Sequence, residues 1–248
     1  MKAMVFAAGL GTRLRPLTDD CPKALVTVAG RTLLDITLSR LCTFGVREVI
    51  VNVHHFADQV VDYLAANQNF GMRIEVSREE ELLNTGGGLK KAAWFFLEAG
   101  SNAEEPFFIH NVDVLSTIDL ARMAQFHAQR NALATLAVQE RGTSRPLLFD
   151  AGSQLRGRGG PSKSAPETSA PTFQSLAFSG IHVVSPRIFA KLHEEGAFSI
   201  VDAYVRLAGQ GESILGFRAD GSYWRDLGRP DDLIAAERDV ADGTYLGQ

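Results

Sequence analysis

Glycine, arginine and lysine gather in the stretch "AAGLGTRLRPLTDDCPKAL", residues 7–25, which directly follows a short apolar run. Glycines allow backbone N–H groups to approach an anion closely, and arginine and lysine add positive charge. A loop after the first strand of an open α/β sheet lies at the edge where ligands bind. The stretch therefore predicts a phosphate-binding loop.

Two common phosphate-binding motifs do not fit this stretch. The dinucleotide-binding fingerprint needs a third glycine where the chain has Leu14, and it rarely tolerates two arginines in the turn. A P-loop needs Gly-Lys followed by Ser or Thr, which is absent. The chain instead reads Gly-Leu-Gly-Thr-Arg-Leu-Arg-Pro-Leu-Thr, and Pro-Lys follows after a spacer.

Residues 9–23 resemble the motif of the sugar-1-phosphate nucleotidylyltransferases, GxGTRLxPLT followed by PK. The matching positions are Gly9, Gly11, Thr12, Arg13, Leu14, Pro16, Leu17, Thr18, Pro22 and Lys23. The resemblance extends over nearly the whole chain. It implies an enzyme that joins a nucleoside triphosphate (NTP) to a sugar 1-phosphate and releases pyrophosphate.

Such a reaction brings two anions together, so cations must meet both reactants. We expect backbone N–H groups of the loop to bind the nucleotide, at Ala8, Gly9, Gly11 and Thr12. Arg13 would hold the departing pyrophosphate, and Lys23 would place a compact charge beside the α-phosphate. These two are the predicted catalytic residues.

Two aspartates are candidate ligands for Mg²⁺, which accompanies triphosphates and prefers carboxylate oxygens. Asp113 ends a buried strand in "HNVDV", and Asp226 precedes the last helix in "YWRDLGRPDDL". In the resembled family, aspartates in corresponding segments bind the metal, which assigns that role to this pair. Taken singly, each aspartate also fits a strand end or a helix cap.

Further site residues are implied by shorter segments. "TGGG" (85–88) resembles the family's nucleobase segment and nominates Gly86 and Gly87, although a plain helix N-terminus explains it too. The residues assigned to the sugar phosphate are Asn52, Asn111, Arg145, Ser179 and Gly180. Arg141 flanks the same strand start as Arg145, where either arginine also fits a solvated position.

Two positions depart from the family pattern. Val112 replaces the usual glycine before the first aspartate, and Asn84 stands where closely related sequences often carry an acidic residue. Valine restricts the backbone beside the carboxylate. Substrate fit or turnover can therefore differ from that of other members.

The elements that must position these residues alternate in the first half. Expected strands lie at 2–8, 47–53, 72–76 and 106–114, and expected helices at 33–44, 56–67 and 88–99. This alternation predicts a Rossmann-like α/β fold, with a mixed, mostly parallel central sheet and helices on both faces.

The second half of the sequence does not show this regular alternation of strands and helices. Expected strands lie at 132–140, 145–150, 174–185 and 213–219, and expected helices at 186–195, 199–209 and 229–240. Residues 157–171 are rich in Gly, Ser and Pro, so we expect a mobile loop within 151–172 of a single domain, 1–248.

The composition and net charge of the chain argue against several classes of protein. A chain of 248 residues with net charge −4 argues against nucleic-acid binding, which needs clustered positive charge. Neither a signal peptide nor a membrane span is expected, because the apolar runs are too short. Two cysteines without metal-ligand spacing suit the reducing cytoplasm.

The segments "GTRLRPLT", "TGGG" and "FSGI" are similar to those of compact family members that use UTP and N-acetylmuramate 1-phosphate, a role connected with the cell wall. Two alternatives stay open at this point. One is transfer from GTP to mannose 1-phosphate, and the other is a catalytically silent sensor of nucleotide sugars. The oligomeric state is left open.

Overall fold

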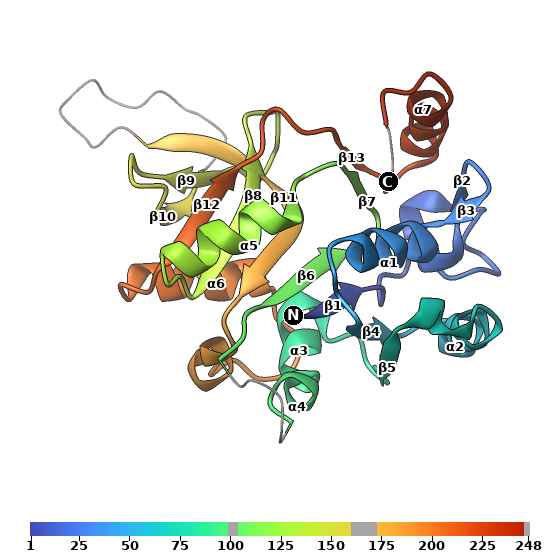
Figure 1. The fold of residues 1–248 in the computed structure, drawn as a ribbon, viewed down its shortest axis with the longest axis horizontal. Coiled ribbons are helices and arrows are strands. Elements are labelled where there is room, and N and C mark those ends of the chain that lie inside the picture. The colour runs from blue at the N-terminus through green and yellow to red at the C-terminus, as the bar shows by residue number, and fades with distance from the viewer. Residues whose placement is uncertain (99–103, 160–172, 246–248) are drawn as a thin grey trace.

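The computed structural model describes residues 1–98, 104–159 and 173–245, and Figure 1 shows their arrangement. The strands are β1 (Lys2–Phe6), β2 (Thr27–Val28), β3 (Arg31–Thr32), β4 (Glu48–Val53), β5 (Arg73–Arg78), β6 (Phe107–Asn111), β7 (Val114–Ser116), β8 (Ala134–Gln139), β9 (Leu147–Phe149), β10 (Leu155–Arg158), β11 (Gln174–Val184), β12 (Ile214–Arg218) and β13 (Trp224–Asp226). The α-helices are α1 (Leu33–Thr43), α2 (Ala57–Ala66), α3 (Asn84–Lys91), α4 (Ala93–Phe96), α5 (Leu120–Gln129), α6 (Ile200–Gly209) and α7 (Pro230–Ala241). Short 3₁₀ helices are η1 (Thr12–Leu14), η2 (Lys23–Leu25), η3 (Gln68–Gly71) and η4 (Pro186–Lys191).

The central sheet of the described chain has nine strands, ordered β10-β9-β11-β6-β1-β4-β5, with β8 bonded to β11 and β12. The strands β6, β1, β4 and β5 run parallel, whereas β11 pairs antiparallel with β6, β8 and β9. The mixed Rossmann-like sheet expected from the sequence is confirmed. Its antiparallel pairs lie where the alternation of strands and helices stops.

Strand register determines which loops meet. Phe6, the last residue of β1, stands opposite Asn52 of β4 on one side and Asn111 of β6 on the other. The carboxyl ends of parallel strands share one edge of a sheet, where ligands bind in such folds. The loops that follow β1, β4, β5 and β6 are therefore gathered at this edge.

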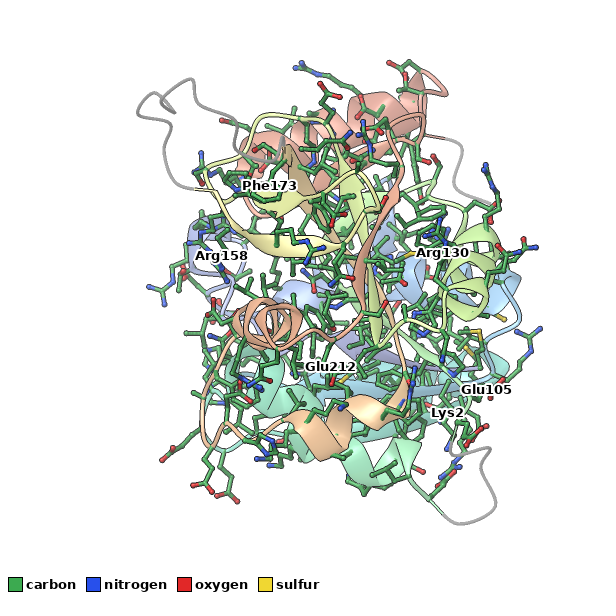
Figure 2. The ribbon with its side chains drawn as sticks, turned by 90° about the vertical axis from the view of Figure 1, so that its left-hand side faces the viewer. Lys2, Glu105, Arg130, Arg158, Phe173 and Glu212 are labelled. Atoms are coloured by element: carbon green, nitrogen blue, oxygen red, sulfur yellow. The ribbon has the colours of Figure 1, made fainter. Side chains whose placement is uncertain are left out.

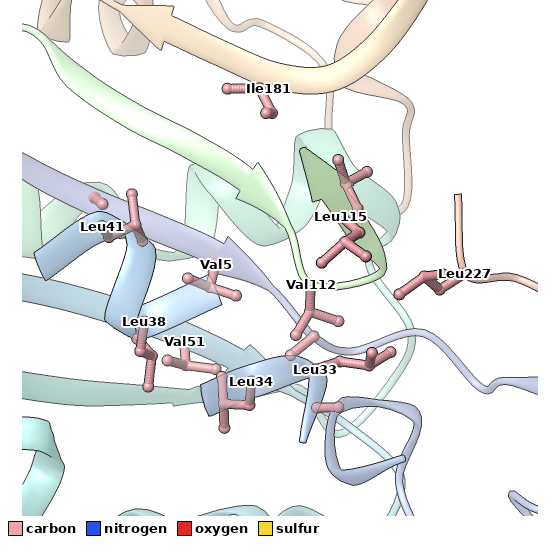
Figure 3. Close-up of a cluster of buried hydrophobic side chains, with 14 of the residues drawn as sticks. Val5, Leu33, Leu34, Leu38, Leu41, Val51, Val112, Leu115, Ile181 and Leu227 are labelled. Atoms are coloured by element: carbon pink, nitrogen blue, oxygen red, sulfur yellow. The ribbon is translucent and has the colours of Figure 1, made fainter. Parts of the chain in front are cut away.

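Apolar residues of β1 alternate between the two faces of the sheet, and each face is covered by helices. Ala3 and Val5 join a cluster with residues of α1, α2, α5 and α7, while Met4 and Phe6 join a second cluster with residues of α3, α4 and α6. Figure 3 shows part of the first cluster, which includes Val5 of β1 and Leu38 of α1. Burial on both faces explains why β1 is apolar throughout.

Several boundaries differ from the sequence expectations. Residues 84–88 already belong to α3, and the helix expected at 186–195 is the shorter η4. Helix α5 is not among the expected elements, although Leu120, Met123 and His127 recur on its buried face. The strand expected at 145–150 shortens to β9.

The first part of the segment 151–172, where a mobile loop is expected, contains the strand β10. Leu155 is fully buried, and β10 pairs antiparallel with β9. A turn held by Asp150, whose Oδ1 accepts the N–H groups of Gly152 and Gln154, starts this strand. Residues 160–172 lie outside the described residues, and Figure 2 shows Arg158 and Phe173, on either side of them, on the same side of the molecule.

No helix in the described ranges combines the length and the apolar character that crossing a bilayer requires.

Three histidines are buried within this fold. His182 Nδ1 lies 2.9 Å from the Tyr204 hydroxyl, and His127 Nδ1 lies 3.0 Å from Thr135 Oγ1. Burial lowers the pKa of His182 to about 3 and the pKa values of His110 and His127 to about 4. All three are therefore neutral in the folded protein at neutral pH.

Mild acid should destabilise the fold through these histidines. An unfolded histidine takes up its proton near pH 6.5, so between about pH 6.5 and about pH 4 the unfolded state binds more protons, and the free energy of unfolding falls by up to about 1.4 kcal/mol per pH unit for each buried histidine. Urea unfolding at about pH 7 and about pH 5.5 measures this loss. Replacement of the exposed histidine, His55→Asn, should leave the pH dependence unchanged. Equal free energies of unfolding at the two pH values would contradict the expectation.

Consecutive glycines let α3 pack closely against the segment before α6. A Cβ atom at Gly87 would lie 2.4 Å from the backbone oxygen of Gly196, and one at Gly86 would lie 2.2 Å from the ring of Phe198. The N–H group of Gly86 also donates to the backbone oxygen of Phe198 at 2.8 Å. Close approach of two backbones therefore explains these glycines.

The substitution Gly87→Ala should destabilise the protein by about 1–3 kcal/mol, because the opposing backbone cannot easily move aside. Helix propensity alone predicts the opposite sign, a gain of up to about 1 kcal/mol. Gly209→Ala in α6 is the matched control, since nothing lies within 4 Å of an added Cβ there. Urea unfolding measures the change in the free energy of unfolding for Gly87→Ala and for Gly209→Ala. Equal stabilisation of the two variants would refute the packing argument.

Candidate active site

The loop after β1 has a fixed shape. Gly11 has φ +65°, and a Cβ atom there would lie 2.9 Å from Thr18 Cγ2. The Thr18 hydroxyl and the Leu14 N–H both donate to the Gly11 carbonyl at 2.8 Å. Glycine is thus needed both for the left-handed backbone and for the close approach of Thr18. The loop is held in position before any ligand arrives.

A cavity of about 370 Å³ opens beside this loop. Its lining comes from the carboxyl ends of β1, β4 and β6, from residues that follow β1, β5 and β6, and from one residue that follows β13. The lining residues are Phe6, Ala7, Ala8, Gly9, Leu10, Gly11, Thr12, Arg13, Lys23, Asn52, Glu79, Leu82, Asn84, Thr85, Asn111, Val112, Asp113 and Gly228. Most of the site residues expected from the sequence are therefore brought together.

Lys23 and Asp113 form an ion pair at the cavity wall. Lys23 lies on η2, and its side chain is only 9% exposed. Its Nζ donates to Asp113 Oδ2 across a sequence separation of 90 residues. A lysine buried to this degree needs a charged partner, and here the partner is one of the two candidate metal ligands.

Asp226 is carried to the same place by a short strand ladder. β13 pairs antiparallel with β7, which sets Asp226 opposite Val114, and the Leu227 N–H donates to the Asp113 carbonyl at 2.8 Å. Burial and the nearby charge of Asp113 raise the pKa of Asp226, while Lys23 and Arg13 act in the opposite direction. The two carboxylates are therefore close enough to repel each other.

Gly228 allows Arg13 to approach Asp226. A Cβ atom at Gly228 would lie 2.5 Å from Asp226 Oδ1 and 2.7 Å from Arg13 Nη2. The Gly228 N–H also donates to Asp226 Oδ1 at 3.0 Å. The four charged groups expected at the site, two cations and two carboxylates, thus converge.

Glu79 is a site residue that the sequence analysis missed. It is 4% exposed and lines the cavity. Its Oε1 accepts from Asn52 Nδ2 at 2.7 Å, and its Oε2 accepts from the Leu83 N–H at 2.9 Å. Asn52 Oδ1 in turn accepts from the Ala7 N–H at 2.8 Å, which links the β4 and β5 ends to the loop after β1. Its neighbours Arg78 and Glu80 are charged and exposed, so the local sequence gives no sign of its burial.

The glycines nominated for the nucleobase do not line the cavity. Gly86 and Gly87 pack against residues 196–198, and the N–H group of Gly86 is bonded there. Their neighbours Asn84 and Thr85 line the cavity instead. Asn84 has φ +59°, and its Oδ1 accepts from the Thr85 N–H at 2.9 Å.

Ser179 and Gly180 lie beside the cavity wall. A Cβ atom at Gly180, which has φ +74°, would lie 2.8 Å from Asn111 Nδ2. Ser179 is fully buried; its hydroxyl lies 3.3 Å from Gln139 Oε1, and its carbonyl accepts from Trp224 Nε1 at 2.8 Å. Of this group, Asn111 alone lines the cavity.

Arg145 is exposed and does not line the cavity. Its backbone N–H bonds Thr143 Oγ1 at 3.2 Å in the turn that leads to β9.

Val112 replaces a family glycine without entering the charged cluster. Its side chain is 4% exposed and belongs to the hydrophobic cluster of Figure 3, where it lies near Leu33. Its N–H donates to the Phe6 carbonyl at 3.1 Å, and this bond continues the pairing of β6 with β1. The core therefore accommodates this departure from the family pattern.

Of the two candidate metal ligands, Asp113 lines the cavity, and Asp226 does not line it but lies near Asp113 and the two cations. Among the residues that the structure describes, no group of three or more His, Cys, Asp or Glu side chains is arranged to hold a metal ion alone. Two carboxylates beside a wide cavity match Mg²⁺, which usually keeps water and substrate phosphates among its ligands.

Comparison with known proteins gives consistent results. Residues 2–149 match the family model described as nucleotidyl transferase. The chain is 36% identical over 250 residues to the N-acetylmuramate alpha-1-phosphate uridylyltransferase of Caulobacter vibrioides, with 97% of each chain covered. It is 29% identical to the mannose-1-phosphate guanylyltransferase of Mycobacterium tuberculosis, covering 97% of this chain but 65% of that protein, which is less than two thirds of its length.

Solved structures share the fold at lower identity. A putative glucose-1-phosphate thymidylyltransferase from Bacillus anthracis superimposes with a TM-score of 0.80 at 17% identity, covering 98% of this chain and 96% of the other. A UDP-glucose pyrophosphorylase complexed with UDP-glucose gives a TM-score of 0.77 at 18% identity, covering 98% of each chain. Because the family model matches more than half of the residues and the Caulobacter relative is matched along nearly its whole length, the chain belongs to the nucleotidyl transferase family, as a sugar-1-phosphate nucleotidyltransferase.

Proposed function

We propose that the enzyme transfers a uridylyl group from UTP to N-acetylmuramate 1-phosphate, or to a closely similar sugar 1-phosphate, and releases pyrophosphate. The observation that carries this choice is the 36% identity to the Caulobacter uridylyltransferase along 97% of both chains. The product is a UDP-activated amino sugar, which assigns the enzyme to cell-wall metabolism. The cysteines Cys21 and Cys42 are both free, which agrees with a reducing cytoplasm.

The reaction is a direct displacement at phosphorus. A phosphate oxygen of the acceptor forms a bond to the α-phosphorus of the NTP. The bond from that phosphorus to the bridging oxygen breaks, and its electron pair leaves with pyrophosphate. The acceptor phosphate is ionised at neutral pH, so no general base is required. The kinetics are sequential, and parallel lines in double-reciprocal plots would contradict this.

The donor half of the site is assigned to the loop after β1. Backbone N–H groups from Ala8 to Thr12 bind the triphosphate, Arg13 binds the departing pyrophosphate, and Lys23 stabilises charge at the α-phosphate. The fixed shape of the loop supports this assignment, because donors held in place lose little free energy on reorganisation. Holding the reactants in line contributes further, up to about 7–11 kcal/mol.

Asp113 and Asp226 are assigned to Mg²⁺. Two carboxylates that repel each other, with a cavity beside them for phosphate oxygens, suit this ion. Bound there, Mg²⁺ would neutralise part of the charge on the phosphates. Lys23 and Arg13 would then share their hydrogen bonds between the two aspartates and the substrate phosphates.

The acceptor and base contacts are assigned from the remaining residues. We assign Asn52, Asn111, Ser179 and Gly180 to binding of the sugar phosphate. Arg145 stays a prediction that depends on the family resemblance. For the nucleobase, Asn84 and Thr85 are better placed than Gly86 and Gly87, since they line the cavity.

The leading alternative is transfer from GTP to mannose 1-phosphate, which the mannose-1-phosphate guanylyltransferase relatives at 26–29% identity favour. A catalytically silent sensor is disfavoured, because a protein without turnover has little need for four converging charged groups. Base choice rests on a few edge contacts in the cavity.

A panel of substrates tests the proposal. Pyrophosphate release is measured with Mg²⁺ for UTP, GTP, CTP, ATP and dTTP against the 1-phosphates of N-acetylmuramate, N-acetylglucosamine, glucose and mannose. We expect UTP with N-acetylmuramate 1-phosphate to exceed the other pairs in kcat/KM by at least about tenfold, which corresponds to about 1.4 kcal/mol. A preference for GTP with mannose 1-phosphate would establish the alternative. Nucleotide binding without release would establish the sensor.

The substitution Lys23→Ala should lower kcat/KM by about 10²–10³, as expected for loss of a preorganised charge at the reacting phosphate. Lys23→Arg retains the charge and should keep more activity. Lys91→Ala removes an exposed lysine on α3 and serves as the control that keeps normal rates. Thermal unfolding shows whether each variant is folded, and normal turnover by a folded Lys23→Ala enzyme would refute the role of Lys23.

A further inference from the structure

Arg141 is half-buried and held between two segments next to Asp226. Its guanidinium carbon lies 3.5 Å from the centre of a Trp224 ring, and Nη2 donates to the Phe178 carbonyl at 2.7 Å. Its Nε is buried and has no hydrogen-bond partner in the described part of the protein. An arginine has five N–H donors, so most of this side chain's hydrogen-bonding capacity is unused.

Two other partly buried arginines are paired with carboxylates, whereas the buried Arg40 bonds only a backbone carbonyl and, like Arg141, has an Nε without a hydrogen-bond partner in the described residues. Arg225 lies 2.6 Å from Asp239, and Arg206 lies 2.8 Å from Glu194. Within the described ranges, Arg141 has no carboxylate within 4.0 Å. A partly buried cation without a counter-charge is costly, and an anion that binds beside it would supply that charge.

Stacking fixes the direction of this cation. Trp224 Nε1 donates to the Ser179 carbonyl at 2.8 Å, so the indole ring is itself tied to β11. A planar guanidinium stacked on an aromatic face loses little freedom when it then binds a planar or tetrahedral anion. The arginine, the tryptophan and the backbone of residues 178–180 form one rigid unit.

This unit adjoins the acceptor residues rather than the donor loop. Arg141 contacts β11 and β13, next to Ser179 and Gly180, whereas Arg13 and Lys23 extend from the loop after β1. Trp224, on which Arg141 stacks, lies on β13 two residues before Asp226, and the charge of Asp226 opposes the lowering of the Arg141 pKa that burial causes. Asp226 therefore lies near Arg141 as well as near Arg13 and Lys23.

We propose that Arg141, stacked on Trp224, binds the phosphate of the sugar 1-phosphate acceptor. The inference rests on the sugar-1-phosphate reaction described above but not on the choice of UTP or of N-acetylmuramate. The acceptor phosphate is a dianion that must approach a second polyanion, and a bidentate guanidinium matches its geometry. Neither Arg141 nor Arg145, the arginine first expected in this role, is among the residues that line the cavity, but Arg141 is held on Trp224, two residues before Asp226, whereas Arg145 is exposed in a turn.

Steady-state kinetics of Arg141→Met and Arg141→Lys test this role, with the best acceptor of the substrate panel varied at saturating NTP and the NTP varied at saturating acceptor. For Arg141→Met, KM for the sugar 1-phosphate should rise about 10- to 100-fold, the effect of losing hydrogen bonds to a charged group, while KM for the NTP changes less than about twofold. Arg141→Lys keeps a positive charge without the bidentate geometry and should give an intermediate KM. Arg122→Gln removes an exposed arginine on α5 and should leave both constants unchanged.

Thermal unfolding of each variant separates binding from folding. A binding role leaves the unfolding temperature of Arg141→Met close to that of the unaltered protein. An unchanged KM for the acceptor, or an equal rise in both KM values, would overturn the proposal. A rise caused by Arg145→Gln and not by Arg141→Met would give the phosphate contact to Arg145. If the panel selects mannose 1-phosphate with GTP, the uridylyl assignment fails, and Arg141 is then tested with mannose 1-phosphate.

Discussion

The site depends on two aspartates that are held together although their charges repel. The ladder between β13 and β7 and the hydrogen bond from Leu227 to the Asp113 carbonyl fix their separation through the backbone. Lys23 and Arg13 offset the repulsion only in part, since burial and Asp113 still raise the pKa of Asp226. Backbone hydrogen bonds thus keep side-chain charges in an arrangement that the charges alone would not adopt. Such perturbed carboxylates are a common mark of functional sites.

Much of this could be read from the sequence, because local patterns report local structure. The loop after β1 was identified from glycines and cations in one short stretch, and the parallel half of the sheet from the alternation of strands and helices. Asp113 and Asp226 lie far apart in the chain, and no periodicity relates them. Their pairing was anticipated only through family resemblance, and the structure supplies the physical link in the β13–β7 ladder.

The remaining features depend on contacts between distant segments of the chain. Patterns in a single sequence do not reveal such contacts. Glu79 looks like one of several acidic residues in a loop, yet its two oxygens bind Asn52 and the Leu83 N–H. The glycines of α3 look like a ligand loop, yet they are explained by the backbone of residues 196–198. The strand that contains Leu155 lies in a polar, glycine-rich stretch of sequence. It could not be predicted, because local composition does not show that this stretch pairs with β9.

Strand β11 joins the two parts of the site. It pairs with β6, whose end carries Asn111 at the cavity, and also with β8 and β9 in the antiparallel half. Its register with β8 shifts between Phe178 and His182, so Ser179 and Gly180 occupy an irregular stretch. Bulges of this kind re-aim side chains without dismantling a sheet. With the proposed roles, substitutions in this short stretch of β11 would change which sugar phosphate is accepted. The loop after β1, to which the triphosphate is assigned, would remain unchanged.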